Sequence, residues 1–505
     1  MKRLRDFFVP IAIFLLALNI RFVCLLKFMR QDYVFEKYTT LAHNIVKMGW
    51  IGKNVFGDNP LYIYFHAIIQ TLFGQYAFST AIIIQFIIGS LSCVLTYYIA
   101  RKVFDNKVAI TASIIHAFYG MMIVYDGSFI PVTLIIFFNS LAILFLLKFE
   151  EDRKIRNAFM AGVALGLSAN TQPYVLIFVL FYLSLKIIGP SKNKLKESLS
   201  GCLLLPATVM LLLLPVTIRN YVVGKDLVPV TASAGIIFYV SNNPQASGAL
   251  AAPPQEILPI LDKELRGDIM TSDITVENNS YRDIAMLQSG RKLKPSEVSN
   301  YWFRKSFQFI IREPLAYLRL QLRKLFFSIN AYEVSDASDA YINYMALNKL
   351  PFFNFGIIFP LGVLGFIVSI RFRKKLMLLY GMLVLYYASL LIFCATSRYR
   401  MPAVPFLIIF CAYGISYLWE HIKLKRLKPL FFLVIFLLTL SAVSFHENDL
   451  IKDFKKHQYA FNIYFLQAAS DYRKGDRQKA RELFNKAVEL YPSLATRVER
   501  IMENK

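Results

Sequence analysis

Residues 10–38 read PIAIFLLALNIRFVCLLKFMRQDYVFEKY, and the interpretation of the whole chain starts from this stretch. Its first part is almost wholly apolar, and a helix needs about 20 such residues to cross the hydrocarbon core of a membrane. The basic sequence MKRLR precedes it, and no small-residue cleavage site of the A-x-A kind follows. We therefore predict an uncleaved first span at residues 8–27, beyond which two acids and a base leave the membrane together.

The composition of the chain fits a multi-pass membrane protein. Of its 505 residues, 56% are hydrophobic and only 18% are charged, which is too few charges for soluble domains of this total length. The net charge of +24 could suggest a nucleic-acid partner. However, the basic residues occur in short clusters between apolar runs, as in membrane proteins with basic cytoplasmic loops. We therefore exclude nucleic acid as a partner.

Hydrophobic runs predict about eleven transmembrane helices. The pair at 157–188 is short for two crossings, and the TQP sequence inside it predicts two short helices that meet outside the membrane. The predicted spans are 8–27, 76–100, 108–125, 130–148, 157–172, 174–188, 199–218, 353–370, 376–394, 403–420 and 429–445.

Alternate linkers differ in charge, and this difference predicts the orientation. One set, which includes MKRLR, RKVFDNK, RFRKK and HIKLKRLK, carries Lys or Arg in every member. The short members of the other set lack both residues, with the exception of SRYR at 397–400. Basic loops remain in the cytoplasm. The N-terminus is therefore predicted to be cytoplasmic, and the long loops and the C-terminus periplasmic or extracellular, in a protein of the cytoplasmic membrane.

Four domains follow from this arrangement. We expect an N-terminal transmembrane module with a catalytic first outer loop at 28–75, a large outer loop of mixed α/β structure, further transmembrane helices and a helical tail. In the large loop, the basic apolar segment at 301–330 predicts two interfacial helices broken near Pro314. The tail contains one unit that resembles a tetratricopeptide repeat, and such a unit must pack on a neighbour. The domain boundaries are 1–218, 219–352, 353–445 and 446–505.

Acidic residues of the outer face are the candidate catalytic groups. Asp32 follows the first span, Glu36 lies one helical turn later, and Asp126 is the only charged residue between Lys107 and Lys148. A carboxylate held near aromatic rings at an interface can have a raised pKa and act as a general base. The alternatives are solvated helix ends for Asp32 and Glu36 and a helix cap for Asp126.

Basic residues of the same face are candidates for binding a phosphate. Arg suits bidentate phosphate contacts, and two arginines lie in the short SRYR turn. The alternative for these side chains is contact with lipid headgroups, or a helix that simply lies on the membrane. The candidates are Arg219, Arg323, Lys324, Arg398 and Arg400.

Other chemistry finds no support in the sequence. It contains no Walker sequence, no H-E-x-x-H motif and no dinucleotide-binding glycine run. The chemistry that remains is group transfer from a lipid phosphate, in which arginines hold the phosphate and a carboxylate deprotonates the acceptor.

An ordered series of segments resembles a known enzyme family from about residue 8 to residue 420. The series includes QDYVFEKYTTLAHNIVKMGW, NPLYIYFHAIIQTLFG, AFYGMMIVYDGSF, PVTIRNYVVG, LRLQLRKLFFSINAYE and SRYRMPAVP. It resembles bacterial GT-C glycosyltransferases of the protein O-mannosyltransferase and aminoarabinose-transferase type, often called family 39. The resemblance implies an inverting membrane transferase that uses a polyprenyl-phosphate sugar on the outer face.

The resemblance also implies roles for particular residues. Asp32 would be the catalytic base, and Asp126 would position the acceptor or the donor. Arg219, Lys324, Arg398 and Arg400 would lie near the lipid phosphate. A substrate pocket would draw on nearby aromatic and polar residues, namely Tyr33, Asp58, Tyr62, Tyr64 and Asn220.

The chain also departs from the family pattern. Relatives often place two acids together in the first loop, whereas here Tyr33 follows Asp32. This departure leaves Glu36 open as the base and makes a divalent metal possible but not favoured, so no metal ligands and no cofactor are predicted. Many relatives have Arg where this chain has Gln172.

Two other functions remain open. A transporter or flippase of lipid-linked glycans would place charges at the bilayer midplane, and an assembly protein would act through its tail. A surface-polysaccharide ligase is a further enzymatic alternative. The expected partners are a polyprenyl-phosphate sugar, membrane lipids and a protein, lipid or glycan acceptor. A protein bound by the tail is a further candidate partner.

Overall fold

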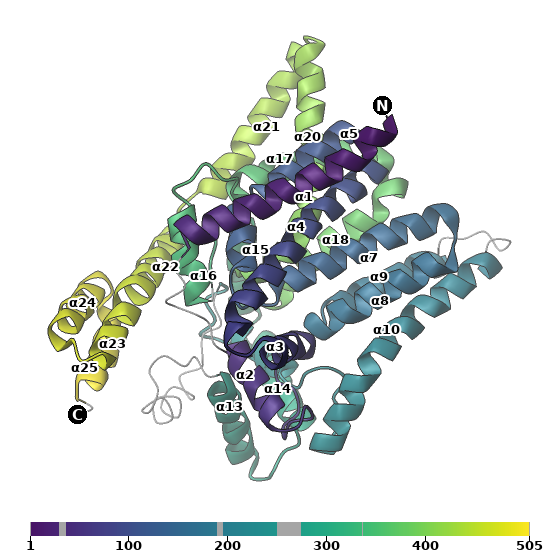
Figure 1. Ribbon diagram of the computed structural model, residues 1–505. Helices are drawn as coiled ribbons and strands as arrows, with labels where there is room; N and C mark the ends of the chain where they lie inside the picture. The colour runs from purple at the N-terminus through teal and green to yellow at the C-terminus, as the bar shows by residue number, and fades with distance from the viewer. Residues whose placement is uncertain (1, 30–36, 189–194, 250–273, 336, 504–505) are drawn as a thin grey trace.

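The computed structural model describes residues 2–29, 37–188, 195–249, 274–335 and 337–503, and it is almost entirely helical (Figure 1). Within these ranges the only β-type pairing outside helices is one isolated bridge between Tyr119 and Phe353. The predicted α-helical polytopic fold is therefore confirmed.

Each predicted span corresponds to a helix, and one of them is split in two. Among the described residues, seven segments are long and apolar enough to cross a membrane, and they include α1, α4, α7, α10, α18, α20 and α21. The other predicted spans form shorter helices. The predicted span at 108–125 is the one that is split, since α5 ends at Ala117 and a new helix starts at Gly120. The helices are α1 (Lys2–Lys27), α4 (Ala77–Val103), α5 (Asn106–Ala117), α6 (Gly120–Asp126), α7 (Val132–Asp152), α8 (Ile155–Thr171), α9 (Val175–Ile188), α10 (Leu195–Gly224), α17 (Phe355–Val368), α18 (Arg373–Ile392), α20 (Val404–Lys423) and α21 (Leu427–Phe445).

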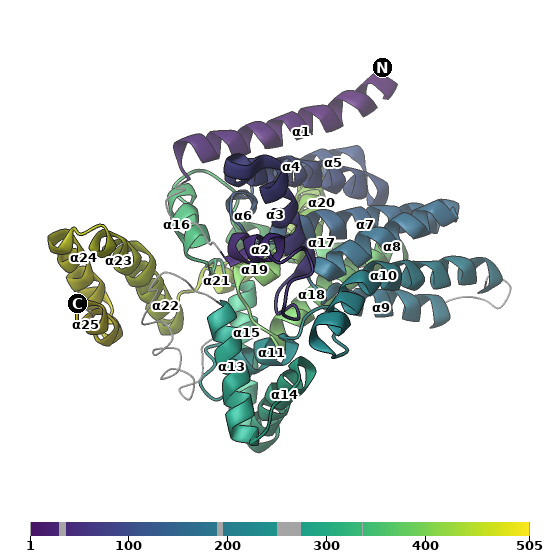
Figure 2. The same cartoon turned by 60° about the horizontal axis from the view of Figure 1, so that its bottom comes forward.

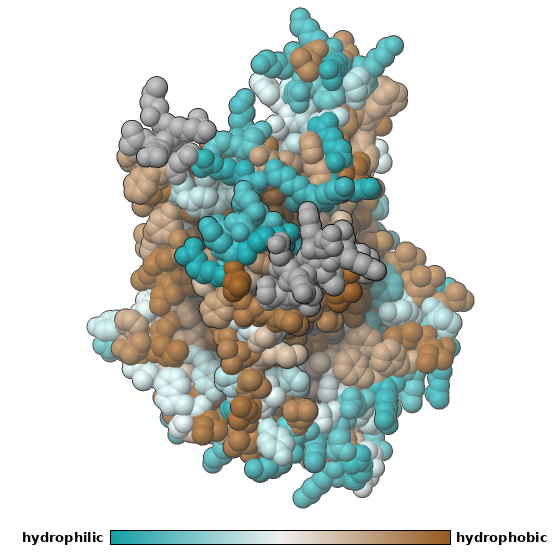
Figure 3. Space-filling view, turned by 90° about the vertical axis from the view of Figure 1, so that its right-hand side faces the viewer, coloured by the Kyte–Doolittle hydropathy of each residue, from teal (hydrophilic) through white to brown (hydrophobic). Residues whose placement is uncertain are grey.

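The helices of the two long loops lie at one end of the helix bundle, opposite the N-terminus. The N-terminus and the turn between α20 and α21 lie at the top of Figure 1, and the outer-loop helices α2 (Lys37–Lys47), α3 (Pro60–Phe73), α13 (Ile274–Ser289) and α14 (Pro295–Arg312) lie at the bottom. Figure 3 shows a broad hydrophobic belt across one side, with hydrophilic side chains above and below it. We call the end that carries α2, α3, α13 and α14 the loop-bearing end.

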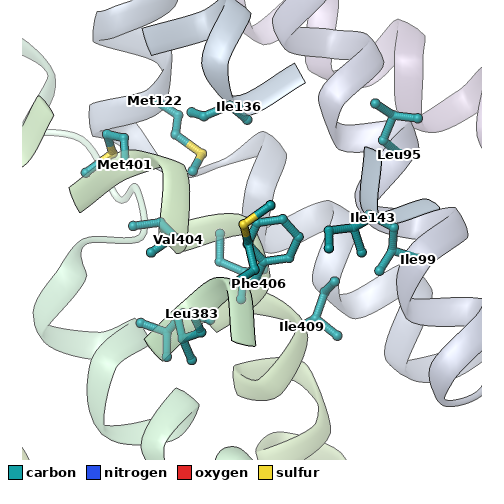
Figure 4. Close-up of a cluster of buried hydrophobic side chains, with 14 of the residues drawn as sticks. Leu95, Ile99, Met122, Ile136, Ile143, Leu383, Met401, Val404, Phe406 and Ile409 are labelled. Atoms are coloured by element: carbon teal, nitrogen blue, oxygen red, sulfur yellow. The ribbon is translucent and has the colours of Figure 1, made fainter. Parts of the chain in front are cut away.

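The core of the bundle joins helices that are far apart in the sequence. Figure 4 shows Ile143 of α7, Leu383 of α18 and Phe406 of α20 in one buried cluster with residues of α4. Helices α17 and α20 approach closely at Gly365, where an added Cβ would lie 1.8 Å from the carbonyl oxygen of Phe410. Small residues permit such contacts between membrane helices. Spans from the N-terminal and C-terminal parts of the chain are thus held in one unit.

The large loop is helical where it is described, so the expected mixed α/β structure is not supported. The segment GIIFYVS, which has the composition of a strand, belongs to α11 (Ala234–Ser241). It packs with α13 and α14 around Trp302, whose indole N–H donates to the carbonyl of Tyr281 at 3.1 Å. A short apolar run does not distinguish a strand from a buried helix, and here the helical neighbours determine the outcome.

The segment forms two helices with a break at the predicted place, and their position at a membrane interface stays a prediction. Helix α14 ends at Arg312 and α15 (Pro314–Ile329) starts at the proline. An exposed apolar stripe runs along both helices at intervals of three or four residues, which is helical spacing. This stripe fits a helix that lies on a membrane surface. Its members are Phe307, Ile311, Leu315, Leu318, Leu322 and Leu325.

The tail folds into short helices that pack on one another. Helices α23 (Leu466–Arg473) and α24 (Arg477–Leu490) enclose the buried residues Ala469, Ala480 and Phe484. They pack on α22 (Asp449–Tyr459) through a π-helical turn, η6 (Ala460–Phe465), and η6 also contacts α16 (Ser338–Leu347) of the large loop. Figure 2 shows this tail to one side of the bundle. Its relation to tetratricopeptide repeats stays a prediction.

Candidate functional site

Polar contacts join the two helices of the first loop. The Lys37 ammonium lies 2.5 Å from a carboxylate oxygen of Asp58, and the amide of Asn59 donates to the hydroxyl of Tyr38 at 3.0 Å. These bonds connect the start of α2 to the start of α3. Asp32, Tyr33 and Glu36 lie outside the described residues.

Tyr62, a predicted pocket residue, belongs to a buried hydrogen-bond chain. Its hydroxyl donates to the amide oxygen of Gln85 at 2.6 Å, and Gln85 donates to the backbone carbonyls of Asp126 and Ser128, both at 3.0 Å. The chain connects α3 through α4 to the end of α6. Tyr64 instead donates to the carbonyl of Trp50, which is in the first loop.

Asp126 forms a buried ion pair. Its carboxylate accepts from the Arg21 guanidinium at 2.8 Å and from the Thr133 hydroxyl at 2.6 Å, and both charged side chains are almost fully buried. Gly89 makes room for it, because an added Cβ there would lie 2.2 Å from the carboxylate. The pair holds α1 against α4, α6 and α7. Each carboxylate oxygen of Asp126 thus accepts one hydrogen bond, one from Arg21 and one from Thr133.

Arg219 and Asn220 fasten the first loop to the start of the large loop. The Arg219 guanidinium donates to the carbonyl of Ile51 at 2.7 Å and stacks on Phe56 at 3.8 Å from its ring centre. The fully buried Asn220 accepts from the backbone N–H of Phe56 and donates to the carbonyls of Val228 and Val230. Both side chains thus connect the two loops.

The SRYR segment lies beside α6. The hydroxyls of Ser397 and Tyr125 are 2.6 Å apart, and Tyr125 precedes Asp126 in the sequence. Arg398 is only partly buried and donates to the hydroxyl of Tyr399 at 3.0 Å. Tyr399 in turn lies near Tyr174 of the predicted TQP turn. The structure thus brings three outer turns of the prediction together.

Arg400 is paired deep in the protein. Its guanidinium lies 2.5 Å from a carboxylate oxygen of Glu333, donates to the carbonyl of Asn330 at 2.9 Å and covers the ring of Phe355. Glu333 also accepts from the hydroxyl of Tyr119 at 2.5 Å. The structure therefore places Arg400 in a buried ion pair, whereas Arg398 is the more accessible of the two predicted arginines.

Lys324 is fully buried and is held by neutral oxygen atoms. Its ammonium donates to the side chain of Asn242 at 2.8 Å and to the carbonyl of Leu391 at 3.0 Å. No carboxylate of the described residues forms an ion pair with it. Burial lowers the pKa of Lys324 from its ordinary value of 10.5 to about 8. Its neighbour Arg323 is exposed on the same helix.

Two charged residues were missed by the sequence analysis. Arg21 lies inside the first predicted span, and charged side chains in spans normally have a partner. That rule predicts an acidic partner for Arg21, but it does not select Asp126 from the other acidic residues. Glu333 gave no comparable signal, because the 219–352 loop contains several acidic residues.

The described side chains form no evident metal-binding cluster. Within the part of the chain that the structure describes, no group of three or more His, Cys, Asp and Glu side chains is arranged to hold a metal ion. The expectation of no metal ligands, with a divalent metal possible but not favoured, stays a prediction.

The fold and these contacts can be compared with known proteins. Residues 58–218 match the family model described as dolichyl-phosphate-mannose-protein mannosyltransferase. This match confirms the resemblance to GT-C glycosyltransferases, and it spans α3 to α10, including Asp126. No match was found among curated proteins.

Several solved structures align with this chain at low sequence identity. The oligosaccharyltransferase from Archaeoglobus fulgidus in the apo form is 14% identical, with a TM-score of 0.48, over 86% of this chain and 54% of that protein. The chain thus spans about half the length of that enzyme. ArnT from Cupriavidus metallidurans in the apo state is 13% identical, with a TM-score of 0.35, over 82% of this chain and 79% of that protein.

Proposed function

We propose that this protein transfers a sugar from a polyprenyl-phosphate donor to an acceptor at the outer face of the cytoplasmic membrane. The family match over residues 58–218 is the observation that carries the proposal, because that family's name describes a lipid-phosphate sugar donor and a transferase. The loop-bearing end is then the outer face. A flippase would place its charges at the bilayer midplane, whereas the family match over residues 58–218 favours a transferase.

The phosphate of the donor would bind near Lys324 and Arg398. Lys324 carries a positive charge that only neutral oxygens contact among the described residues, so an anion would compensate its desolvation. Arg398 is partly exposed and offers further donors. The apolar stripe on α15 would keep the polyprenyl chain in the membrane while its phosphate reaches Lys324 from the same helix.

The reaction would follow a direct displacement with inversion. A carboxylate of the first loop, Asp32 in our proposal and Glu36 in the alternative, removes the proton from an acceptor hydroxyl. The acceptor oxygen forms a bond to the anomeric carbon, and the bond from that carbon to the phosphate oxygen breaks. The polyprenyl phosphate leaves with the electron pair, and the cations stabilise its growing charge.

The polar contacts around the first loop would support this step. The pair of Lys37 with Asp58 joins the two helices of the loop, and Arg219 and Asn220 fasten its middle part to the end of α10. Asp126 acts as a positioning residue through Arg21. Tyr62 and Tyr64 would shape the pocket with Tyr33.

The test is a turnover assay on detergent-purified protein with radiolabelled polyprenyl-phosphate sugars. Wild-type protein should turn over at least one donor in the presence of EDTA, and Asp32→Asn should lose about 10²–10⁴-fold in rate. Glu36→Gln is the matched variant, since it should retain activity if Asp32 is the base. Loss only in Glu36→Gln would move the base, and the absence of both donor binding and turnover would refute the proposed function.

The phosphate site has its own test. Lys324→Ala should weaken donor binding about 10-fold or more, because a charge-assisted contact is lost. Arg312→Ala, which removes an exposed charge at the end of α14, is the control and should bind the donor normally. Equal binding by both variants would remove Lys324 from the proposed site.

A further inference from the structure

A large cavity lies between the tail and the bundle, and none of its lining residues is a predicted site residue. Its volume is about 910 Å³. One wall comes from α16 and the outer ends of α17 and α21, and the other comes from α22, η6 and α24. Small-ligand pockets commonly measure about 300–1,000 Å³, so this cavity is large enough for a chain of several linked units.

The lining has an unusual chemistry. Five tyrosines, three asparagines, three lysines and two glutamates surround the cavity, and only four lining residues are wholly apolar. Opposite charges are partly paired, since Lys455 contacts Glu447 and lies over the ring of Tyr332. Tyrosine rings supply apolar surface between these polar groups. No strand edge lines the cavity in the described residues, so an extended peptide could not add to a sheet.

A polyhydroxylated ligand matches this lining. Sugar rings have apolar C–H faces that stack on aromatic rings, and their hydroxyls bond to amide, carboxylate and ammonium groups. Tyr459 and Tyr464 lie on the tail side with ring centres 5.5 Å apart, and Asn348 is exposed on the bundle side. Tyr464 belongs to the π-helical turn η6, and such turns occur frequently at functional sites.

The cavity is also connected to the SRYR segment. Asn330 lines the cavity, and its backbone carbonyl accepts from Arg400 of the buried ion pair with Glu333. Ser397, at the start of the same segment, contacts Tyr125 beside Asp126. A ligand in the cavity would therefore lie at the edge of the proposed transfer site, on the side where an acceptor could enter.

We propose that the tail and the bundle form a binding site for an oligosaccharide, and that the acceptor of the reaction is a glycan held there. The role as acceptor site rests on the proposed transferase function, whereas the binding of sugar does not. In this proposal the tail forms one wall of the binding site.

The experiment measures binding in the absence of donor. Full-length protein in a detergent without a sugar headgroup is titrated with α-mannotetraose, chitotetraose and maltotetraose, with a Ser/Thr-rich peptide as the competing ligand. We expect saturable binding of at least one sugar at millimolar concentration or below. Tyr459→Ala and Asn348→Ala, from opposite walls, should each weaken it about 3- to 10-fold. Tyr76→Ala, an exposed tyrosine outside the cavity, should bind as wild type does.

The outcomes separate this proposal from the proposed function. Binding of none of the three sugars, binding that all three variants retain, or binding of the peptide alone would each overturn the oligosaccharide site. Donor hydrolysis is measured on the same preparations. Sugar binding that depends on Tyr459 without any donor hydrolysis would keep the sugar site and remove its role as acceptor site. Normal donor hydrolysis without sugar binding would remove the sugar site and keep the proposed transferase function.

Discussion

The buried pair of Arg21 and Asp126 gives the most direct test of the structure. Replacing one partner leaves the other charge buried and unpaired, which typically costs about 3–5 kcal/mol. Both side chains are almost fully buried here, at 0% and 5% exposure, so we expect Asp126→Asn to fall within that range. The Thr133 hydroxyl should hold the Asn side chain, and the Gln85 side-chain amide, which donates to the backbone carbonyl of Asp126, should hold the backbone there.

The assay is a double-mutant cycle with SDS-induced unfolding in mixed micelles. Arg21→Met keeps the length of the side chain and removes its charge, so the double variant should be more stable than the sum of the two single changes predicts. The coupling free energy should be about 1–3 kcal/mol. The control pair is Lys102 with Glu151 at the surface, for which coupling of about 0–1 kcal/mol is expected. Additive effects at Arg21 and Asp126, or a loss below about 1 kcal/mol for Asp126→Asn, would refute the ion pair.

Three further predictions concern the site. Asn220→Ala should destabilise the protein by about 1–3 kcal/mol and speed proteolysis of the first loop, because it leaves the buried N–H of Phe56 without its acceptor; unchanged proteolysis would contradict this attachment. Lys324→Met should raise the unfolding temperature at pH 7 while it weakens donor binding, since a buried charge is removed. Because the folded-state pKa of Lys324 is lowered to about 8, the stability gap between this variant and wild type should narrow as the pH rises from about 8 towards 10.5, and donor binding by wild type should fall over the same range. A stability gap that stays constant with pH would show that Lys324 does not titrate there. Gly89→Ala should destabilise the protein as strongly as Asp126→Asn, because its Cβ would displace the carboxylate, and a normal unfolding temperature would argue against that contact.

The sequence by itself determined the class of the protein and the positions of its spans. Apolar runs of about 20 residues have few structural solutions other than a membrane helix, so α1, α7 and α20 were predictable. The break at Pro314 was equally predictable, because proline cannot continue a helix. Basic clusters in alternate linkers are also a local signal, and they predicted which linkers lie together on one side of the membrane.

Only the tertiary structure decided which polar groups meet. Arg21 and Asp126 are 105 residues apart, and Arg400 and Glu333 are 67 apart, so nothing in the local sequence selects these partners. The strand-like run at 235–241 became a helix because helical neighbours pack around it. The cavity between tail and bundle likewise arises from packing between distant elements. Local sequence fixes which segments can be helices in a membrane, whereas the cost of burying a charge without a partner decides how those helices are arranged.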